Sequence, residues 1–283
     1  MTPSVIIHGG FFSESATNLE TKIAKQNSLL HIINLAAEFL LTHSAVETVV
    51  YAVALLEDDT LFNAGTGSQI QADGKIRMSA SLMDGDSKKF SGVINIQDIK
   101  NPILLAEILM NEEDRVLASA EALNFAKSKS IPFYNTEIPA RRADYERKLQ
   151  TLATGTVGCV ALDKNGKIAA ATSTGGKGFE IPGRVSDSAT TAGNFANQHA
   201  GISCTGVGED IVSAALASSI VNRVSDGLSL QAATEKTFSE MKEFNGFGGI
   251  IGISANGEIF HKDSFPYMVY AYSDGKNEPV VFG

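Results

Sequence analysis

The sequence of 283 residues has no tryptophan, only two cysteines and no run of basic residues interleaved with aromatic ones. Cys159 and Cys204 lie in apolar or small-residue stretches, which predicts buried thiols rather than a disulfide or a catalytic cysteine. The chain has a formal net charge of −9, so we do not expect nucleic acid as a partner. No window reaches the roughly 20 apolar residues of a membrane span, and the amino terminus shows no secretory leader. We therefore expect no membrane association and a cytoplasmic protein.

What the sequence does contain is typical of a globular protein. Hydrophobic residues make up 43% and charged residues 19% of the chain, with 26 glycines. This length suffices for one large domain or two modest ones with a substantial core. Hydrophobic periodicity and turn signals predict the elements as follows. Helices are expected at about 19–42, 45–57, 102–110, 113–128, 211–224 and 230–244, and strands at 5–7, 68–72, 75–83, 91–96, 156–163, 168–173, 249–254 and 258–261. In each half of the sequence, strands are followed by helices and then by strands again. This order indicates a layered α+β fold.

Residues 130 to 155 differ from the sequence on either side. They show little amphipathic order, and we interpret them as a mobile linker, part of which is compatible with a helix. A strongly patterned strand begins directly afterwards at Thr156. The Gly155–Thr156 junction therefore separates residues 1–155 from residues 156–283. A new chain terminus at this junction would be anchored on a rigid strand.

A threonine at a chain terminus can be a nucleophile because it carries its own base. An α-amine with a pKa of about 8 can accept the proton of the hydroxyl group. Thr156 would become such a terminus if its hydroxyl attacked the Gly155 carbonyl carbon. Glycine suits the preceding position, since it tolerates strained backbone and has no Cβ to obstruct the attack. The dipeptide by itself is also compatible with a plain linker that ends at a strand.

Several motifs in the same order resemble one known family. They are the opening IHGG, the LEDDTLFNAGTGS loop, MSASLMDG, then GTVGCVALDKNGKIAAATSTGG, PGRVSD, SCTGVGED and GFGGIIGIS. Together they cover nearly the whole chain and resemble the plant-type L-asparaginase/isoaspartyl peptidase family of Ntn-hydrolases. The resemblance implies an αββα sandwich of two face-to-face sheets with helices on both outer faces. It also implies self-cleavage between Gly155 and Thr156 and a homodimer of cleaved αβ units.

The resemblance assigns roles to individual residues. Thr156 is expected to be the nucleophile, with Thr174 orienting it. Arg184 and Asp187 are expected to bind the α-carboxylate and α-ammonium of the substrate, and the Gly208 carbonyl to face the ammonium. Thr205 and Gly206 would donate to the oxyanion. Asn63 would lie near the nucleophile and support the precursor and acyl-enzyme steps.

No cofactor is expected for catalysis, but the resemblance implies a structural sodium ion. Main-chain carbonyl groups of the loop after the second helix would bind it, and hard cations favour such oxygen ligands. The expected ligands are Leu56, Glu57, Asp59, Phe62, Ala64 and Thr66. The ion would hold the Asn63 segment in shape.

These residues also permit other interpretations. Arg184 and Asp187 could form a loop salt bridge of little energetic consequence. Residues 205–208 could be a phosphate-binding turn, but they lack a third glycine and a P-loop lysine. His8 is expected to end a strand and shape the pocket backbone rather than act in catalysis. The five histidines show no zinc-ligand spacing.

The expected reaction is hydrolysis of L-asparagine, of β-aspartyl (isoaspartyl) dipeptides, or of both. Alternatives are a glycosylasparaginase-like or taspase-like threonine hydrolase and a catalytically silent aspartate-binding relative. Phe11 and Phe12 replace the small residues that often follow HisGlyGly in the family. They would either narrow the leaving-group side of the pocket or pack against the first helix, and we favour packing. The linker, which is short for the family, ends in AlaThrGly instead of the more usual HisAsp, which leaves the cleavage rate open.

Overall fold

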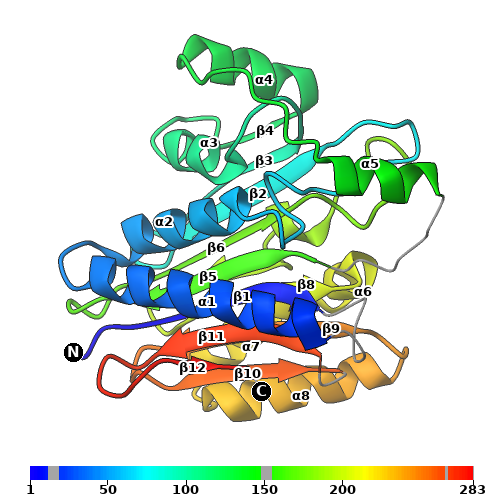
Figure 1. Cartoon of the computed structure of the whole chain (residues 1–283). Coiled ribbons are helices and arrows are strands. Elements are labelled where there is room, and N and C mark those ends of the chain that lie inside the picture. The colour runs from blue at the N-terminus through cyan, green and yellow to red at the C-terminus, as the bar shows by residue number, and fades with distance from the viewer. Residues whose placement is uncertain (12–18, 148–154, 265–266, 283) are drawn as a thin grey trace.

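The computed structural model describes residues 1–11, 19–147, 155–264 and 267–282. Its strands form two sheets (Figure 1). The larger sheet has the strand order β12 (Val280–Val281), β11 (Met268–Ser273), β1 (Ser4–Phe11), β5 (Val157–Leu162), β6 (Ile168–Thr174), β2 (Met78–Asp84), β3 (Lys89–Ile96) and β4 (Val116–Ala118). The smaller sheet has the order β10 (Ile259–Asp263), β9 (Gly248–Ser254), β8 (Ala200–Gly206) and β7 (Asn194–Ala196).

Helices contact both sheets and confirm the expected mixture of strand and helix. Those beside the larger sheet are α1 (Leu19–Leu40), α2 (Ala45–Asp58), α3 (Pro102–Leu109) and α4 (Ser119–Ser128). Those beside the smaller sheet are α6 (Gly208–Ala214), α7 (Leu216–Ser225) and α8 (Leu230–Lys242). A separate helix, α5 (Pro139–Glu146), and a 3-10 turn, η1 (Asp187–Ala189), complete the elements. Side chains fix two helix starts, since Ser44 and Glu47 form a capping box on α2 and Ser229 caps α8.

Buried apolar side chains form three clusters, which show how the elements pack. The first joins α1 and α2 to the larger sheet and includes Leu29, Val53 and Val157. The second lies between strands of the two sheets and includes Val160 and Ile251. The third joins the smaller sheet to α7 and α8. Alternate residues of β5 belong to the first and second clusters, so this strand is buried on both faces.

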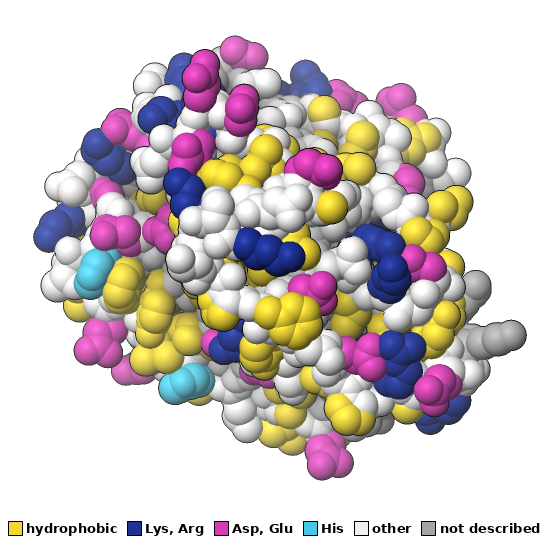
Figure 2. Space-filling view, turned by 90° about the horizontal axis from the view of Figure 1, so that it is seen from above, with side chains coloured by type: hydrophobic (Ala, Val, Ile, Leu, Met, Phe, Trp, Pro, Cys, Tyr) yellow, Lys and Arg dark blue, Asp and Glu magenta, His cyan; other side chains and the backbone are white. Residues whose placement is uncertain are grey.

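The surface shown in Figure 2 carries positive and negative side chains that are interspersed among hydrophobic ones. No helix in the described part of the chain combines the length and the apolar character that a membrane span requires. The two cysteines are buried free thiols, as predicted, and burial raises the pKa of both.

Most expected elements are confirmed to within a few residues, but three are wrong. The single helix expected over 211–224 is two helices, α6 and α7, because Ala215 between them has a φ of +46°. The hairpin expected over 68–83 is a single bridge between Ile70 and Ile76, and the regular strand β2 begins later, at Met78. The helix expected over 113–128 begins instead at Ser119. Val116–Ala118 pair in parallel with β3, and the φ of +55° at Ser119 interrupts the backbone between strand and helix.

Residues from before and after the predicted junction alternate in the larger sheet. Strand β1 lies between β11 and β5, and β6 pairs with β2. The predicted linker contains α5, while residues 148–154 of it lie outside the described part of the chain. The junction thus falls where β5 enters the middle of the sheet.

Candidate active site

Thr156 lies directly before β5 and faces Thr174 at the end of β6. The two strands are antiparallel neighbours, and Val157 pairs with Ser173, so the start of one strand meets the end of the other. The Thr156 hydroxyl donates to Thr174 Oγ1 at 3.2 Å. Thr174 Oγ1 also accepts from the Gly176 amide at 3.1 Å. Both side chains are nearly inaccessible to solvent, so this contact is fixed by the sheet rather than by a mobile loop.

A pocket of about 480 Å³ opens over Thr156. It brings together most of the predicted site residues from distant parts of the sequence. They are Gly155, Thr156, Thr174, Arg184, Asp187, Gly206 and Gly208. A cavity of this size suits a small-molecule ligand.

A cation and an anion converge over Gly208. A Cβ atom at Gly208 would lie 2.6 Å from Arg184 Nη2 and 2.7 Å from Asp187 Oδ1. Any residue larger than glycine at position 208 would therefore place its side chain against the Arg184 and Asp187 side chains. The carboxyl of Asp187 is buried, and loss of solvent raises its pKa to about 7 despite the opposing effect of Arg184. Asp187 Oδ2 has no hydrogen-bond partner among the described residues. This arrangement fits the carboxylate and ammonium of an α-amino acid.

Glu209 is a pocket residue that the sequence reasoning missed. Its carboxylate accepts from Arg184 Nε at 2.7 Å and from Nη2 at 3.0 Å, and Lys177 Nζ donates to it at 3.3 Å. Arg184 lowers the pKa of Glu209 to about 2. Arg184 thus pairs with Glu209, and no direct ion pair joins it to Asp187 in the described part of the chain. Because a guanidinium has five N–H groups, Nη1 remains for a second carboxylate.

The predicted oxyanion residues lie at the end of β8. Gly206 has a φ of +139°, and a Cβ there would come within 2.8 Å of the Gly248 Cα, so this position requires glycine. Thr205 is fully buried, and its hydroxyl has no partner among the described residues. Gly206 lines the pocket and Thr205 lies next to it in the strand.

Asn63 connects the junction to the loop after β6. Its side-chain amide donates to the Gly176 carbonyl at 2.5 Å, and its carbonyl oxygen accepts from the Gln69 amide at 2.8 Å. A Cβ at Gly155 would lie 2.8 Å from the Asn63 Cβ. Glycine at position 155 is therefore needed for the close approach of this loop.

His8 does not end a strand as we expected, because β1 continues to Phe11, and it is part of a polar chain between the sheets. Its Nε2 is 2.9 Å from Ser203 Oγ, which is 2.6 Å from Thr172 Oγ1. Burial lowers the pKa of His8 to about 3, against a smaller opposing effect of the Thr156 backbone. So low a pKa keeps the imidazole neutral and makes it a weak base, which fits the expected structural role.

The loop expected to bind sodium folds back onto the end of α2. The Glu57 carbonyl accepts from the Thr66 amide at 2.7 Å and the Asp59 carbonyl from the Phe62 amide at 3.2 Å. A Cβ at Gly65 would clash with the Glu57 carbonyl oxygen. These carbonyl groups each retain a second lone pair, so the closed loop is compatible with a cation.

Phe11 is not in the pocket and does not pack as we expected. Its ring packs against Phe247 with the centroids 4.8 Å apart, and it belongs to the cluster between the two sheets rather than to the one beneath α1. Phe12 lies outside the described residues. The aromatic side chain that does line the pocket is Phe179, which the sequence reasoning did not single out.

Comparison with known proteins agrees with the motifs. The family model described as asparaginase matches residues 1–152 and 137–282. The isoaspartyl peptidase/L-asparaginase of Synechocystis sp. is 45% identical over 297 residues, covering 97% of this chain and 89% of the relative. That of Nostoc sp. is 44% identical over 294 residues, covering 97% and 92%. The plant-type L-asparaginase of Pyrococcus furiosus is 34% identical over 310 residues, covering 98% of each. The chain therefore belongs to the asparaginase family, in its isoaspartyl peptidase and plant-type L-asparaginase branch.

Proposed function

We propose that the chain is a self-cleaving, N-terminal-threonine amidohydrolase that hydrolyses L-asparagine and β-aspartyl dipeptides. One observation carries the proposal. The Thr156 hydroxyl contacts Thr174 in the same pocket in which Arg184 and Asp187 converge over Gly208. A hydroxyl nucleophile and a receptor for an α-amino acid are thus combined. The names of the relatives from Synechocystis and Nostoc support the same two activities.

Maturation would begin when Thr156 Oγ attacks the Gly155 carbonyl carbon. The bond from that carbon to the Thr156 nitrogen breaks, the nitrogen takes up a proton, and an ester remains on Oγ. Water then hydrolyses the ester, which leaves a carboxylate on Gly155 and a free amine on Thr156. The close contact between Asn63 and Gly155 supports this step, since it limits how the scissile peptide can lie.

Catalysis would use the new amine as the base. It accepts the Oγ proton, and Oγ attacks the side-chain amide carbon of the substrate. The amine then gives the proton to the departing ammonia or amino acid, and water hydrolyses the aspartyl ester. Thr205 and Gly206 would donate to the oxyanion, and the loss of one such donor typically costs about 10²–10³ in rate. The unpartnered hydroxyl of Thr205 supports this assignment.

Substrate recognition would depend on the aspartyl half. Arg184 would bind the α-carboxylate, and Asp187 and the Gly208 carbonyl would bind the α-ammonium. Both substrate classes share these groups, so a single site can serve both.

Wider features of the proposal follow the family. We assign the two packed sheets and their helices to the αββα sandwich of Ntn-hydrolases, with residues 1–155 and 156–283 as its two parts. A cytoplasmic homodimer of cleaved units belongs to the same proposal. A sodium ion would be held by the carbonyl groups of Leu56, Glu57, Asp59, Phe62, Ala64 and Thr66. Higher thermal stability in sodium chloride than in choline chloride would support the ion, and equal stability would contradict it.

The proposal is tested by comparing variants of Thr156 and Arg184. Thr156→Ala should remain one chain and release no ammonia from asparagine. Arg184→Ala should still be cleaved, but its KM for asparagine should rise at least 10-fold because the carboxylate partner is lost. Full hydrolysis by Thr156→Ala would refute the mechanism. Cleavage without any hydrolysis of asparagine or β-aspartyl dipeptides would instead favour a glycosylasparaginase-like, taspase-like or silent relative.

A further inference from the structure

Phe179 has an unusual backbone conformation at the wall of the active-site pocket. Its φ is +55°, in the left-handed region that bulky residues seldom adopt. Gly176 and Gly178, which precede it in the same wall, also have positive φ, but glycine adopts this conformation freely. A strained bulky residue persists when the surrounding structure holds it there, and such residues concentrate at functional sites.

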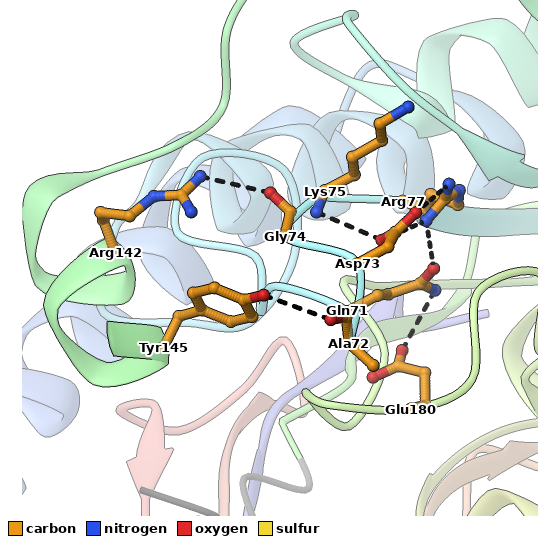
Figure 3. A network of polar contacts seen from close by, with 9 residues as sticks. All are labelled: Gln71, Ala72, Asp73, Gly74, Lys75, Arg77, Arg142, Tyr145 and Glu180. Atoms are coloured by element: carbon orange, nitrogen blue, oxygen red, sulfur yellow. Dashed lines mark hydrogen bonds and ion pairs between the residues drawn. The ribbon is translucent and has the colours of Figure 1, made fainter. Parts of the chain in front are cut away.

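Tyr145 of α5 holds the Phe179 ring. The two rings are stacked, with centroids 5.2 Å apart and planes 9° from parallel. The Tyr145 hydroxyl donates to the Ala72 carbonyl at 3.2 Å, and Arg142 donates to the Gly74 carbonyl at 3.2 Å (Figure 3). Through these bonds α5, which has no buried residue, is fixed on the turn at 71–77.

The backbone of Phe179 is fixed from the other side. Its amide donates to the Ile70 carbonyl at 2.9 Å, and the next residue, Glu180, accepts from the Ala72 amide at 3.1 Å. The buried Glu180 carboxylate accepts from Gln71, whose side-chain carbonyl accepts from Arg77 at 2.6 Å (Figure 3). The position of the ring is therefore determined by the turn and by α5, not by the residues that bind the aspartyl half.

Different elements therefore hold two groups of pocket residues. Asp187 begins η1, Gly208 begins α6, and Arg184 pairs with Glu209 of α6. Phe179 instead packs on the Ile70–Ala72 segment and α5. The aspartyl half is common to all substrates of the proposed reaction, and the leaving group is the part that varies. Asparagine releases ammonia, which makes no contact with an apolar wall.

We infer that Phe179, held by Tyr145, is the specificity-determining residue for the leaving group, and that the pocket favours β-aspartyl dipeptides whose leaving amino acid has an apolar side chain. The inference rests on the proposed function and names its substrate class. An apolar side chain gains contact with the half-buried ring and loses water, which a glycine leaving group cannot do.

The test compares kcat/KM for β-Asp-Leu, β-Asp-Gly and asparagine. The value of kcat/KM depends only on the steps up to release of the leaving group, during which the leaving group is still attached to the substrate. Wild-type enzyme should prefer β-Asp-Leu to β-Asp-Gly by about 10-fold, in the range that hydrophobic pockets achieve. Phe179→Gly removes the ring and is at ease with positive φ, so the chain should fold. It should lose the preference for leucine and change asparagine hydrolysis less than about 2-fold.

Variants of Tyr145 give a second reading that does not alter the strained residue. Tyr145→Phe keeps the stacked ring and should keep the leucine preference, whereas Tyr145→Ala should reduce it. An unchanged ratio of leucine to glycine substrate in Phe179→Gly would overturn the inference, as would an equal loss for all three substrates. Wild-type enzyme that hydrolyses asparagine but neither dipeptide would overturn the inference and leave the proposed function standing. Wild-type enzyme that hydrolyses none of the three would refute the proposed function itself.

Discussion

The charges around Gly208 form a short series in which each group sets the state of the next. Lys177 and Arg184 share the carboxylate of Glu209, and the negative charge of Glu209 contributes to the raised pKa of Asp187. Arg184 acts on Asp187 in the opposite direction, but burial outweighs it. Glu209 thus orients the guanidinium of Arg184. Its negative charge also offsets part of the effect by which Arg184 lowers the pKa of Asp187.

Replacement of Glu209 should weaken substrate binding without stopping the reaction. In Glu209→Gln the guanidinium loses its bidentate partner, and the KM for asparagine should rise about 2- to 5-fold, the range of a half-exposed ion pair. kcat should change little. Lys177→Gln, which removes the weaker partner of the same carboxylate, is the matched control and should have the smaller effect. A fall in kcat with constant KM would contradict this role.

The protonation of Asp187 should be visible in the pH dependence of activity. Asp187 must be ionised to bind an ammonium, and its pKa is about 7 in the free pocket. As the pH falls through 7, kcat/KM should therefore decrease, in addition to the decrease caused by protonation of the Thr156 amine near pH 8. In kcat the Asp187 component should disappear, because the bound ammonium keeps the carboxylate ionised.

Glu209→Gln supplies a check on this assignment. Removal of that negative charge lowers the pKa of Asp187, so the Asp187 component of the kcat/KM profile should move to lower pH. Among the charged and titratable neighbours of Asp187 are Arg184, Glu209 and the Cys204 thiol, and the thiol is neutral over this range because burial raises its pKa. A profile that Glu209→Gln leaves in place would show that another group titrates.

Sequence motifs were sufficient to bring most of the expected site residues into one place. Thr156, Thr174, Arg184, Asp187, Gly206 and Gly208 line one pocket, while their roles stay predictions. Glu209 and Phe179 were not found, because their importance comes from contacts with Arg184 and Tyr145, which sequence does not show. For Phe179 a weak signal existed, since a bulky residue follows two glycines spaced through a loop.

Among the elements, β5 has a strict packing requirement at Gly158. His8 of β1 pairs with Gly158 of β5, and the polar chain of His8, Ser203 and Thr172 crosses between the sheets at this point. A Cβ at Gly158 would clash with Ser203 Oγ and lie 2.5 Å from His8 Nε2. Glycine is thus required at position 158, two residues after Thr156.

The Gly158→Ala variant should displace β5 from the polar chain. Overpacking of this kind costs about 1–3 kcal/mol, and the loss should appear as a lower melting temperature together with slower cleavage at Gly155. Adding Ser203→Ala removes the nearest obstacle and should restore part of the stability. If Gly158→Ala alone melts with wild-type enzyme and is cleaved at the same rate, the packing argument is wrong.

The wrongly predicted elements show where local signals are insufficient. Asp73–Gly74 does form a turn, with the Gly74 amide bonded to the Gln71 carbonyl, but its flanks bind α5 and Glu180 instead of each other. Residues 116–118 have a helical pattern locally, yet they pair with β3 as an additional strand of the sheet. In both regions tertiary contacts outweigh the local preference.

At the scale of the whole molecule, the two halves are interleaved rather than adjacent. β1 from the first half is bonded on both sides by strands of the second, and β6 from the second half pairs with β2 from the first. The proposed cleavage at the junction would therefore leave the strand pairs of the described residues intact. The sequence patterns predicted most of the strands in both halves. They did not predict the order of the strands in the sheet, because that order depends on long-range pairing.

The cleaved protein should consequently behave as one folding unit. Calorimetry of the mature form should show a single cooperative transition, and the fragments should stay together on gel filtration without denaturant. Residues 1–155 expressed alone should not fold, because β1 would lack both neighbours. Two separate transitions, or a folded isolated fragment, would contradict the interleaved arrangement.

The central claim is that Thr156 becomes a free amino terminus and then acts as the nucleophile. The most direct measurement is a time course of the purified chain, with denaturing electrophoresis and amino-terminal sequencing set beside ammonia release from asparagine. We predict a second fragment that begins Thr-Val-Gly-Cys and asparaginase activity that rises in step with it. Full activity from the uncut chain, or cleavage at another bond, would contradict the account.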